Sequence, residues 1–303
     1  MPIQTLISIQ KRNADGSAVI RPDGTPNIGI AVDPRKAYTR GYWCVPDSNP
    51  IVVPGGAGTG QAMARFLIDS KGHFDWVYLM GSFPDSPVML DITDQQSNRQ
   101  LQNKPIHSTC IVGSARRPFR LPRNYFLNVG DSQREVTIRL INLSAQTASV
   151  YLYLYGTRFY HHEAPADLAA DYVRRNDYGR KDYSYFMAPW EYGQNGVPTA
   201  LGANASTTFT FDQDDNADME IRKFMMTSTG AFTYELEERD TRRTIMTGRI
   251  HSANGWGNAE FPFYPGDTYL LQRKKQLLLK VTDISGSENS IFATLGGIRF
   301  QYR

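Results

Sequence analysis

Short stretches of alternating apolar and polar residues recur along this chain, and helical patterns are scarce. In residues 135–141 charged side chains alternate with apolar ones, as in a half-buried antiparallel strand. In residues 150–155 both faces are apolar or aromatic, so we expect a strand that is covered on both sides. Turn sequences rich in Gly, Pro, Asn and Asp separate such runs. The pattern predicts an all-β protein built of antiparallel sandwiches.

Two segments have helical character. Residues 164–173 place Pro165 near a first turn and acidic residues early, which predicts a short helix. Residues 61–66 are compatible with a second short helix.

The second half of the chain repeats the first half. The triplet Ile-His-Ser at residues 106–108 returns 144 residues later at residues 250–252. The pattern Gly-x-Arg-Phe closes both copies, at residues 156–159 and 297–300, and these lie 141 residues apart, so one three-residue shift aligns the halves. Further matched pairs are Arg99 and Arg243, Gly113 and Gly257, Phe119 and Phe263, Tyr125 and Tyr269, and Leu154 and Leu295. Two long copies predict two homologous, jelly-roll-like β-sandwich modules and no solenoid.

The repeat divides the chain into four predicted segments. They are an extended N-terminal arm at residues 1–61, a first module at 62–160, a linker at 161–205 and a second module at 206–303. The arm is too rich in Gly, Pro and polar residues to bury a core by itself. We therefore expect it to lie against a module or a neighbouring subunit.

The linker is long for a compact protein and is dense in aromatic and basic side chains. We expect it to be packed on its own modules or on a partner, because Tyr, Trp and Arg are enriched in interface cores. The candidate interface residues are Tyr172, Arg174, Arg175, Tyr178, Tyr183, Tyr185, Phe186, Trp190 and Tyr192.

Charge and composition narrow the class of protein. The 33 basic and 30 acidic side chains give a net charge of +3, so direct nucleic-acid binding is not expected. Cys44 and Cys110 are the only cysteines, which excludes a disulfide scaffold and predicts two buried free thiols. The chain has no run of about 18 apolar residues and its start lacks a secretion signal. We therefore expect no membrane span, and assembly in a reducing cytoplasm.

A glycine-rich stretch follows a strand-like run at residues 51–61. Gly55 and Gly60 have the spacing of a phosphate-binding loop. However, Gln61 and Ala62 stand where that loop needs Lys and Ser or Thr, so the cation that reaches the phosphates is missing. The expected role of this stretch is a flexible hinge between the arm and the first module.

A calcium-loop pattern is also incomplete. Residues 211–218 start like such a loop, but Ala217 replaces its turn glycine and Lys223 its bidentate glutamate. A solvated acidic turn between strands is the expected structure.

The histidines do not predict a metal or catalytic site. His161 and His162 point to opposite faces if they lie on a strand. His107 and His251 are interpreted as equivalent structural positions, because no repeated carboxylate or nucleophile accompanies them. Basic and aromatic residues interleave at residues 114–123, where an interface rim is expected. We therefore expect no enzyme activity, no metal and no cofactor.

Two β modules, a Gly/Pro-rich arm and a Tyr-rich linker together resemble virion structural proteins of tailed bacteriophages. The resemblance implies a non-enzymatic assembly subunit of the capsid, decoration or collar type. Its partners would be copies of itself and other virion proteins, in a virion assembled in the host cytoplasm. One alternative within this class is a small double jelly-roll major capsid protein.

Two further classes stay open. A carbohydrate- or receptor-binding tail component predicts exposed aromatic side chains on a platform of loops. A hydrolase on a β scaffold predicts two carboxylates about 5–10 Å apart in one cleft.

Overall fold

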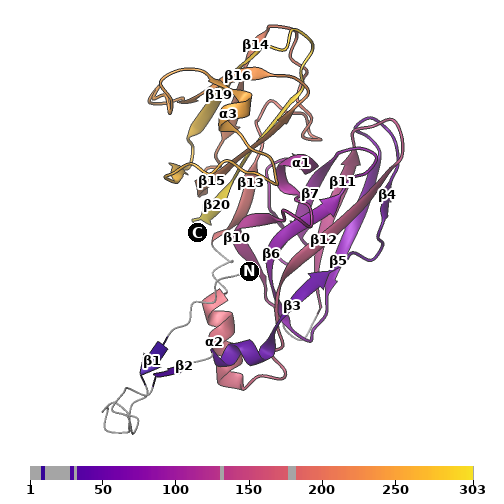
Figure 1. The fold of residues 1–303 in the computed structure, drawn as a ribbon, viewed down its shortest axis with the longest axis vertical. Helices are drawn as coiled ribbons and strands as arrows, with labels where there is room; N and C mark the ends of the chain where they lie inside the picture. The colour runs from indigo at the N-terminus through magenta and orange to yellow at the C-terminus, as the bar shows by residue number, and fades with distance from the viewer. Residues whose placement is uncertain (1–7, 11–27, 31–32, 130–132, 177–181, 303) are drawn as a thin grey trace.

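The computed structural model describes residues 8–10, 28–30, 33–129, 133–176 and 182–302. Strands dominate this part of the chain, and two sandwich-like modules lie one above the other in Figure 1. A separate antiparallel pair, β1 (Ser8–Gln10) and β2 (Ile28–Ile30), comes from the predicted arm. None of the described helices is long and apolar enough to cross a membrane.

Module 1 consists of two antiparallel sheets. In the first, β5, β11, β7 and β8 follow in order and β9 pairs with β7. In the second, β10, β6, β12 and β3 follow in order and β4 pairs with β12. The strands are β3 (Thr39–Cys44), β4 (Ile51–Val53), β5 (Gln61–Ile68), β6 (His73–Ser82), β7 (Val88–Asp94), β8 (Arg99–Gln100), β9 (Ile106–His107), β10 (Phe119–Leu127), β11 (Arg134–Asn142) and β12 (Ala148–Phe159). Two short helical turns, η1 (Pro34–Tyr38) and α1 (Ser108–Ile111), complete the module.

Module 2 repeats this topology, except that β4 and β8 have no counterpart among its described strands. The sheet β14-β19-β16-β17 matches β5-β11-β7-β9, and the sheet β18-β15-β20-β13 matches β10-β6-β12-β3. The strands are β13 (Asp182–Met187), β14 (Ser206–Asp212), β15 (Ala217–Ser228), β16 (Phe232–Glu238), β17 (Ile250–His251), β18 (Tyr269–Leu271), β19 (Gln276–Asp283) and β20 (Ile291–Gln301), and α3 (Ser252–Gly255) matches α1. The predicted fold of two homologous antiparallel β-sandwich modules is confirmed.

The sheets extend beyond the predicted module limits. β3 and β4 belong to the predicted arm, but both pair with β12. β13 belongs to the predicted linker, but it pairs with β20 in the same register as β3 with β12. The rest of the linker includes α2 (Ala166–Asn176), which confirms the helix predicted at residues 164–173.

Two local predictions are wrong. Residues 61–66 form β5 and not a helix, because pairing with β11 and an alternating burial pattern outweigh the helix propensity of the Ala, Met and Gln side chains. The glycine-rich stretch is not a hinge, because strands of module 1 flank it on both sides. Its backbone is held against the turn between β11 and β12, where Gly56 and Ala57 donate to the Ser144 carbonyl at 3.0 and 2.9 Å, and Gly58 donates to the Asn142 carbonyl at 2.7 Å.

The repeated Ile-His-Ser triplet is a capping device. The Nδ1 atom of His107 accepts the backbone N–H of Thr109 at 3.4 Å, and the Nδ1 atom of His251 accepts that of Ala253 at 3.1 Å. Burial lowers the pKa of His107 to about 4, so its ring is neutral and able to accept this bond at pH 7. The interpretation of these histidines as equivalent structural positions is confirmed.

In the repeated Gly-x-Arg-Phe pattern, the glycine and the arginine each have a physical reason to be repeated. Its glycine lies beside a bulge in the neighbouring strand, where a Cβ atom on Gly156 would lie 2.0 Å from the Asp75 carbonyl oxygen. The equivalent Cβ atom on Gly297 would lie 2.1 Å from the Glu220 carbonyl oxygen. No other residue type fits such a close approach of two strands.

The arginine of the same pattern is a buried cation in both modules. Arg158 pairs with Asp69, and Arg299 pairs with Asp214 in the acidic turn of residues 211–218. The guanidinium groups also lie over tyrosine rings, at 4.7 Å from the centre of Tyr42 and 4.6 Å from that of Tyr185. This shared arrangement aligns β3 with β13 residue by residue.

Candidate functional site: the contact between the modules and the surfaces left uncovered

The predicted interface residues separate into three groups, and Tyr178 lies outside the described residues. Tyr172, Arg174 and Arg175 lie on α2. Tyr183, Tyr185, Phe186 and Tyr192 lie at or beside the junction of the modules, and all four are buried. Trp190 is 68% exposed, and the Lys104 ammonium lies 5.2 Å from the centre of its ring.

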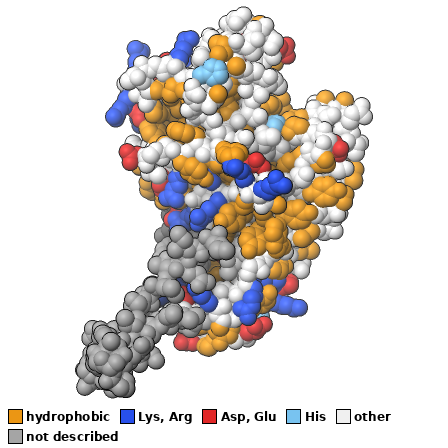
Figure 2. Space-filling view, viewed as in Figure 1, with side chains coloured by type: hydrophobic (Ala, Val, Ile, Leu, Met, Phe, Trp, Pro, Cys, Tyr) orange, Lys and Arg blue, Asp and Glu red, His pale blue; other side chains and the backbone are white. Residues whose placement is uncertain are grey.

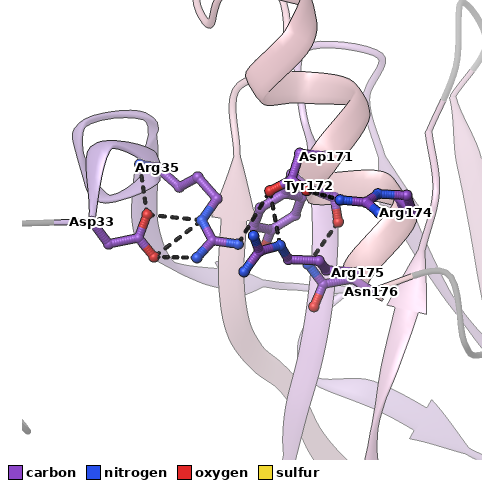
Figure 3. A network of polar contacts seen from close by, with 7 residues as sticks. All are labelled: Asp33, Arg35, Asp171, Tyr172, Arg174, Arg175 and Asn176. Carbon is purple, nitrogen blue, oxygen red and sulfur yellow. Dashed lines mark hydrogen bonds and ion pairs between the residues drawn. The ribbon is translucent and has the colours of Figure 1, made fainter.

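The α2 group fixes the helix to module 1. The Tyr172 ring stacks on Phe159 with ring centres 4.0 Å apart. On the same helix Asp171 pairs with Arg174 at 2.6 Å and with Arg175 at 2.8 Å. Figure 3 shows how this network continues to Arg35, 3.7 Å from Asp171, and from there to Asp33. Hydrogen bonds from Arg174 and Arg175 hold the pKa of Asp171 below its ordinary value, so the carboxylate stays charged.

Phe186 anchors the contact between the modules. Its backbone N–H donates to the Leu101 carbonyl at 2.8 Å, and its carbonyl accepts the Asn103 N–H at 3.3 Å. Its ring is fully buried, with its centre 5.9 Å from that of Phe119 in module 1. Asn103 extends the contact, since its side chain donates to the Ala188 carbonyl and accepts the Ala188 N–H, both at 2.8 Å. The edge of β13 is thus hydrogen bonded to module 1 along its free side.

Tyr192 completes the ladder of β20 beyond the end of β13. Its hydroxyl donates to the Ile291 carbonyl at 2.6 Å and accepts the Ala293 N–H at 2.8 Å. Burial raises its pKa above the ordinary value, so the hydroxyl keeps its proton.

We call residues 101–103, α1 and Phe119 the module 1 tip, because they form the end of module 1 that touches module 2. The His107 ring, which caps α1, lies 4.4 Å from the Phe292 ring of β20, and Cys110 Sγ lies 3.6 Å from the Phe292 carbonyl. Thr109 accepts the backbone N–H of Ala259 at 2.8 Å. Residues from both modules therefore belong to one continuous core.

Lys223 is a buried cation at the same junction. Its ammonium donates to the Arg120 carbonyl and lies 4.2 Å from the centre of the Phe119 ring. Burial, together with the nearby Arg120 charge, lowers its pKa to about 7. Cys110, buried close by, has its pKa raised to about 12 by burial, as does Cys44 in module 1. Both thiols are free, as predicted.

A basic groove of about 390 Å³ lies where the modules and α2 meet. Arginines 120, 123, 175 and 222 line it. Acidic partners compensate three of them, because Asp182 lies 2.5 Å from Arg123, Glu220 lies 3.0 Å from Arg222 and Asp171 lies 2.8 Å from Arg175. Burial raises the pKa of Asp75, which also lines the groove, to about 6. The groove is an ion network within the chain rather than a strongly cationic surface.

One large aromatic surface is not covered by any other part of the chain that the structure describes. The module 1 outer face consists of Trp43, Tyr153 and Tyr155, which lie on the side of the β10-β6-β12-β3 sheet that faces away from the core. Trp43 is 51% exposed, with its ring centre 4.8 Å from that of Tyr155 and 6.0 Å from that of Tyr153. Figure 2 shows hydrophobic side chains gathered in the area where Figure 1 draws β6 and β12. Residues 150–155 are thus covered on one side only, unlike the sequence expectation.

A hollow lies at the corresponding end of module 2. We call residues 245–246, α3 and Phe263 the module 2 tip, and a cavity of about 670 Å³ opens among them. Ile245 and Phe263 are each 43% exposed there. Tyr269 lies at the far side of the cavity and donates to the Glu238 carboxylate. In the described part of the chain, no group of three or more His, Cys, Asp or Glu side chains is placed to hold a metal ion.

No protein-family model and no curated protein matches this chain. Among solved structures, the major capsid protein P2 from bacteriophage PM2 is 10% identical, with 87% of this chain and 98% of that chain covered and a TM-score of 0.44. A peptide-N(4)-(N-acetyl-β-D-glucosaminyl) asparagine amidase is 13% identical, with coverages of 86% and 96% and a TM-score of 0.36. PNGase F, a glycosylasparaginase from Flavobacterium meningosepticum, is 12% identical, with coverages of 87% and 96% and a TM-score of 0.36. At these identities and TM-scores the likenesses assign neither a family nor an activity to this chain.

Proposed function

We propose that this chain is a structural subunit of a virion, of the capsid, decoration or collar type, which acts through protein–protein contacts and not by catalysis. The observation that carries the proposal is the uncovered module 1 outer face. The Trp43 ring contacts those of Tyr153 and Tyr155 and is 51% exposed, and the two tyrosines are partly exposed beside it. A contiguous exposed apolar surface of this kind is typical of an interaction site, and aromatic residues are enriched in interface cores.

The same side of the equivalent sheet in module 2 supports this proposal. There Phe186, Thr294 and Gly296 are buried against module 1. This type of sheet face therefore already serves as a protein contact once within the chain. We infer that its counterpart on module 1 serves the same purpose between chains.

The assignment to a virion rests on the resemblance in organisation, with two β modules, an arm and an aromatic linker. The tandem arrangement of two like sandwiches favours the small double jelly-roll capsid form of the proposal. The copies of this chain and other virion proteins are its proposed partners.

Measuring the mass of the purified chain by light scattering over a range of concentrations tests the proposal. We expect assemblies whose masses are multiples of the 34.2 kDa chain, and regular particles or rings by electron microscopy. A stable monomer at every concentration, also in the presence of the other proteins of the same particle, would contradict it.

Glycan or receptor binding is the second candidate function, and the exposed ring of Trp43 favours it. A flat indole beside Tyr155 can stack on the apolar face of a sugar. The platform lies on a sheet and not on loops, unlike the sequence expectation. Binding to a glycan array that is lost in Trp43→Ala would support this candidate, and an array without any signal would contradict it.

A further inference from the structure

The contact between the modules provides a template for a contact between chains. Within the chain, the module 1 tip packs on the module 2 outer face, which consists of Phe186, Thr294 and Gly296. A Cβ atom on Gly296 would lie 3.4 Å from the Phe186 ring, so both residues lie on the same side of the sheet. Because the modules share strand order and register, each partner in this contact has a counterpart in the other module.

The outer faces correspond residue by residue. Trp43 pairs with Tyr155 across β3 and β12, and Phe186 pairs with Gly296 across β13 and β20. Phe186 is fully buried under the module 1 tip, whereas its counterpart Trp43 is 51% exposed. β3 is also the outermost strand of its sheet, as β13 is. The module 1 outer face thus corresponds to the surface on which the module 1 tip packs in module 2, but in the described structure nothing packs on it.

The tips correspond as well. The N–H of Leu101 donates to the Ile92 carbonyl at 3.1 Å, and the N–H of Ile245 donates to the Leu236 carbonyl at 3.0 Å. The offset of 144 residues that the repeat gave therefore holds at the tips, and it also matches Gln102 with Met246. Leu101 is fully buried, whereas Ile245 is 43% exposed. The module 2 tip therefore has the position of the module 1 tip, but it covers no outer face in the described part of its own chain.

The two uncovered surfaces also compensate each other in size. Gly255 lines the hollow of the module 2 tip where module 1 has the fully buried Ile111, and the Tyr234 hydroxyl fills the space beside Gly255, 1.7 Å from the position of a Cβ atom there. On the outer faces, module 1 has the large residue, because Tyr155 stands where module 2 has Gly296. A filled tip meets a small residue within the chain, and a hollow tip of about 670 Å³ faces the larger aromatic surface between chains.

We propose that the module 2 tip of one copy docks on the module 1 outer face of a second copy, with Trp43 seated in the hollow beside Met246 and Phe263. The backbone N–H of Trp43 then donates to the Ile245 carbonyl, as that of Phe186 does to Leu101. The contact uses different surfaces on the two copies, so it repeats head to tail and builds a ring or a filament. This inference deepens the proposed function and rests on it.

Engineered cysteines test the pairing directly. Phe186 and Gln102 face each other in a parallel bridge, so their counterparts Trp43 and Met246 are expected about 4.8 Å apart, within disulfide range. At a protein concentration raised about 10-fold or more to offset the lost Trp43 ring, the double variant Trp43→Cys/Met246→Cys is expected to give, after mild oxidation, a ladder of covalent dimers and larger species on a non-reducing gel. The native cysteines are buried, with pKa values raised to about 12, and do not interfere.

The single variants are the controls, and neither is expected to crosslink. The absence of a ladder from an assembled double variant would overturn the pairing. A covalent dimer from Trp43→Cys alone would also overturn it, because the outer face would then meet a second outer face.

A pair of aromatic variants gives an independent measurement. Trp43→Ala is expected to weaken self-association about 10-fold or more, as the loss of a central aromatic anchor does. Tyr302 is 52% exposed, follows β20 and belongs to neither surface, so Tyr302→Ala is expected to leave association unchanged. Circular dichroism checks that both variants keep their fold. If the wild type assembles and Trp43→Ala assembles equally well, the inference fails and the proposed function stands; if the wild type is always a monomer, both fail.

Discussion

Replacing Tyr192 by phenylalanine removes one oxygen atom that satisfies two buried backbone groups of β20. The Ile291 carbonyl and the Ala293 N–H would lose their partners at 2.6 and 2.8 Å. Tyr192 is only 3% exposed, so water does not replace the hydroxyl without disturbing the packing. An unpaired buried polar group costs about 1–3 kcal/mol, so Tyr192→Phe is expected to lower the free energy of unfolding by about 2–4 kcal/mol.

Urea unfolding followed by fluorescence, at one fixed protein concentration, measures this loss. The melting temperature is expected to fall by roughly 5–10 °C, given about 2–4 °C per kcal/mol for a protein of this size. The matched control is Tyr264→Phe, because Tyr264 is 58% exposed and loss of its hydroxyl is expected to change stability by no more than about 0.5 kcal/mol. If Tyr192→Phe unfolds like the wild type but fails to assemble, Tyr192 acts in a partner interface, and the structural role argued here is wrong.

Three further predictions concern buried groups and the glycine of the repeat. His107 has a pKa of about 4 in the folded chain, against its ordinary value of 6.5. The unfolded chain therefore binds the proton first as the pH falls, and the free energy of unfolding should decrease by about 3 kcal/mol from pH 6.5 to pH 4. His107→Asn should flatten this loss in unfolding curves measured across that range. Gly297→Ala, with its Cβ 2.1 Å from the Glu220 carbonyl, should lower the melting temperature strongly, whereas Gly248→Ala in open space should not. Lys223 has a pKa of about 7 in the folded chain, so stability should rise with pH between about 7 and 10, and Lys223→Met should remove this rise in urea titrations.

The repeat could be predicted from the sequence because its conserved chemistry is local and restrictive. Gly156 and Gly297 lie at bulges that exclude a side chain, and Arg158 and Arg299 are buried cations with fixed acidic partners. Such positions keep their residue type in both copies, while the surrounding strands change.

The edge strands β3 and β13 could not be predicted as equivalent from the matched pairs of the repeat. They precede the matched blocks, and their common signal is short: Tyr-Trp-Cys at residues 42–44 against Tyr-Phe-Met at residues 185–187. This signal is an aromatic pair followed by a sulfur-containing residue, and it lies in the predicted arm in one copy and in the predicted linker in the other.

The residue types of the interfaces could be predicted from the sequence, but not the surface that each residue contacts. Aromatic density showed that the linker is buried, but it did not distinguish burial within the chain from burial in a partner. Tyr183, Tyr185 and Phe186 are buried within the chain, whereas the aromatic surface left uncovered belongs to residues 151–155, whose pattern is that of a fully covered strand. A strand face that a partner covers has the same apolar pattern as a face that the chain covers itself, so the two kinds of face look alike in the sequence.

The position of β13 has a consequence for the order of events during synthesis. All strands of module 1 have left the ribosome once Phe159 has emerged, so both of its sheets are complete before β13 exists. Until Phe186 arrives, Leu101 and Phe119 have no cover, and the nascent chain presents an apolar end at the stage when aggregation competes with folding. A fragment ending after α2 should therefore need a chaperone that the full chain does not.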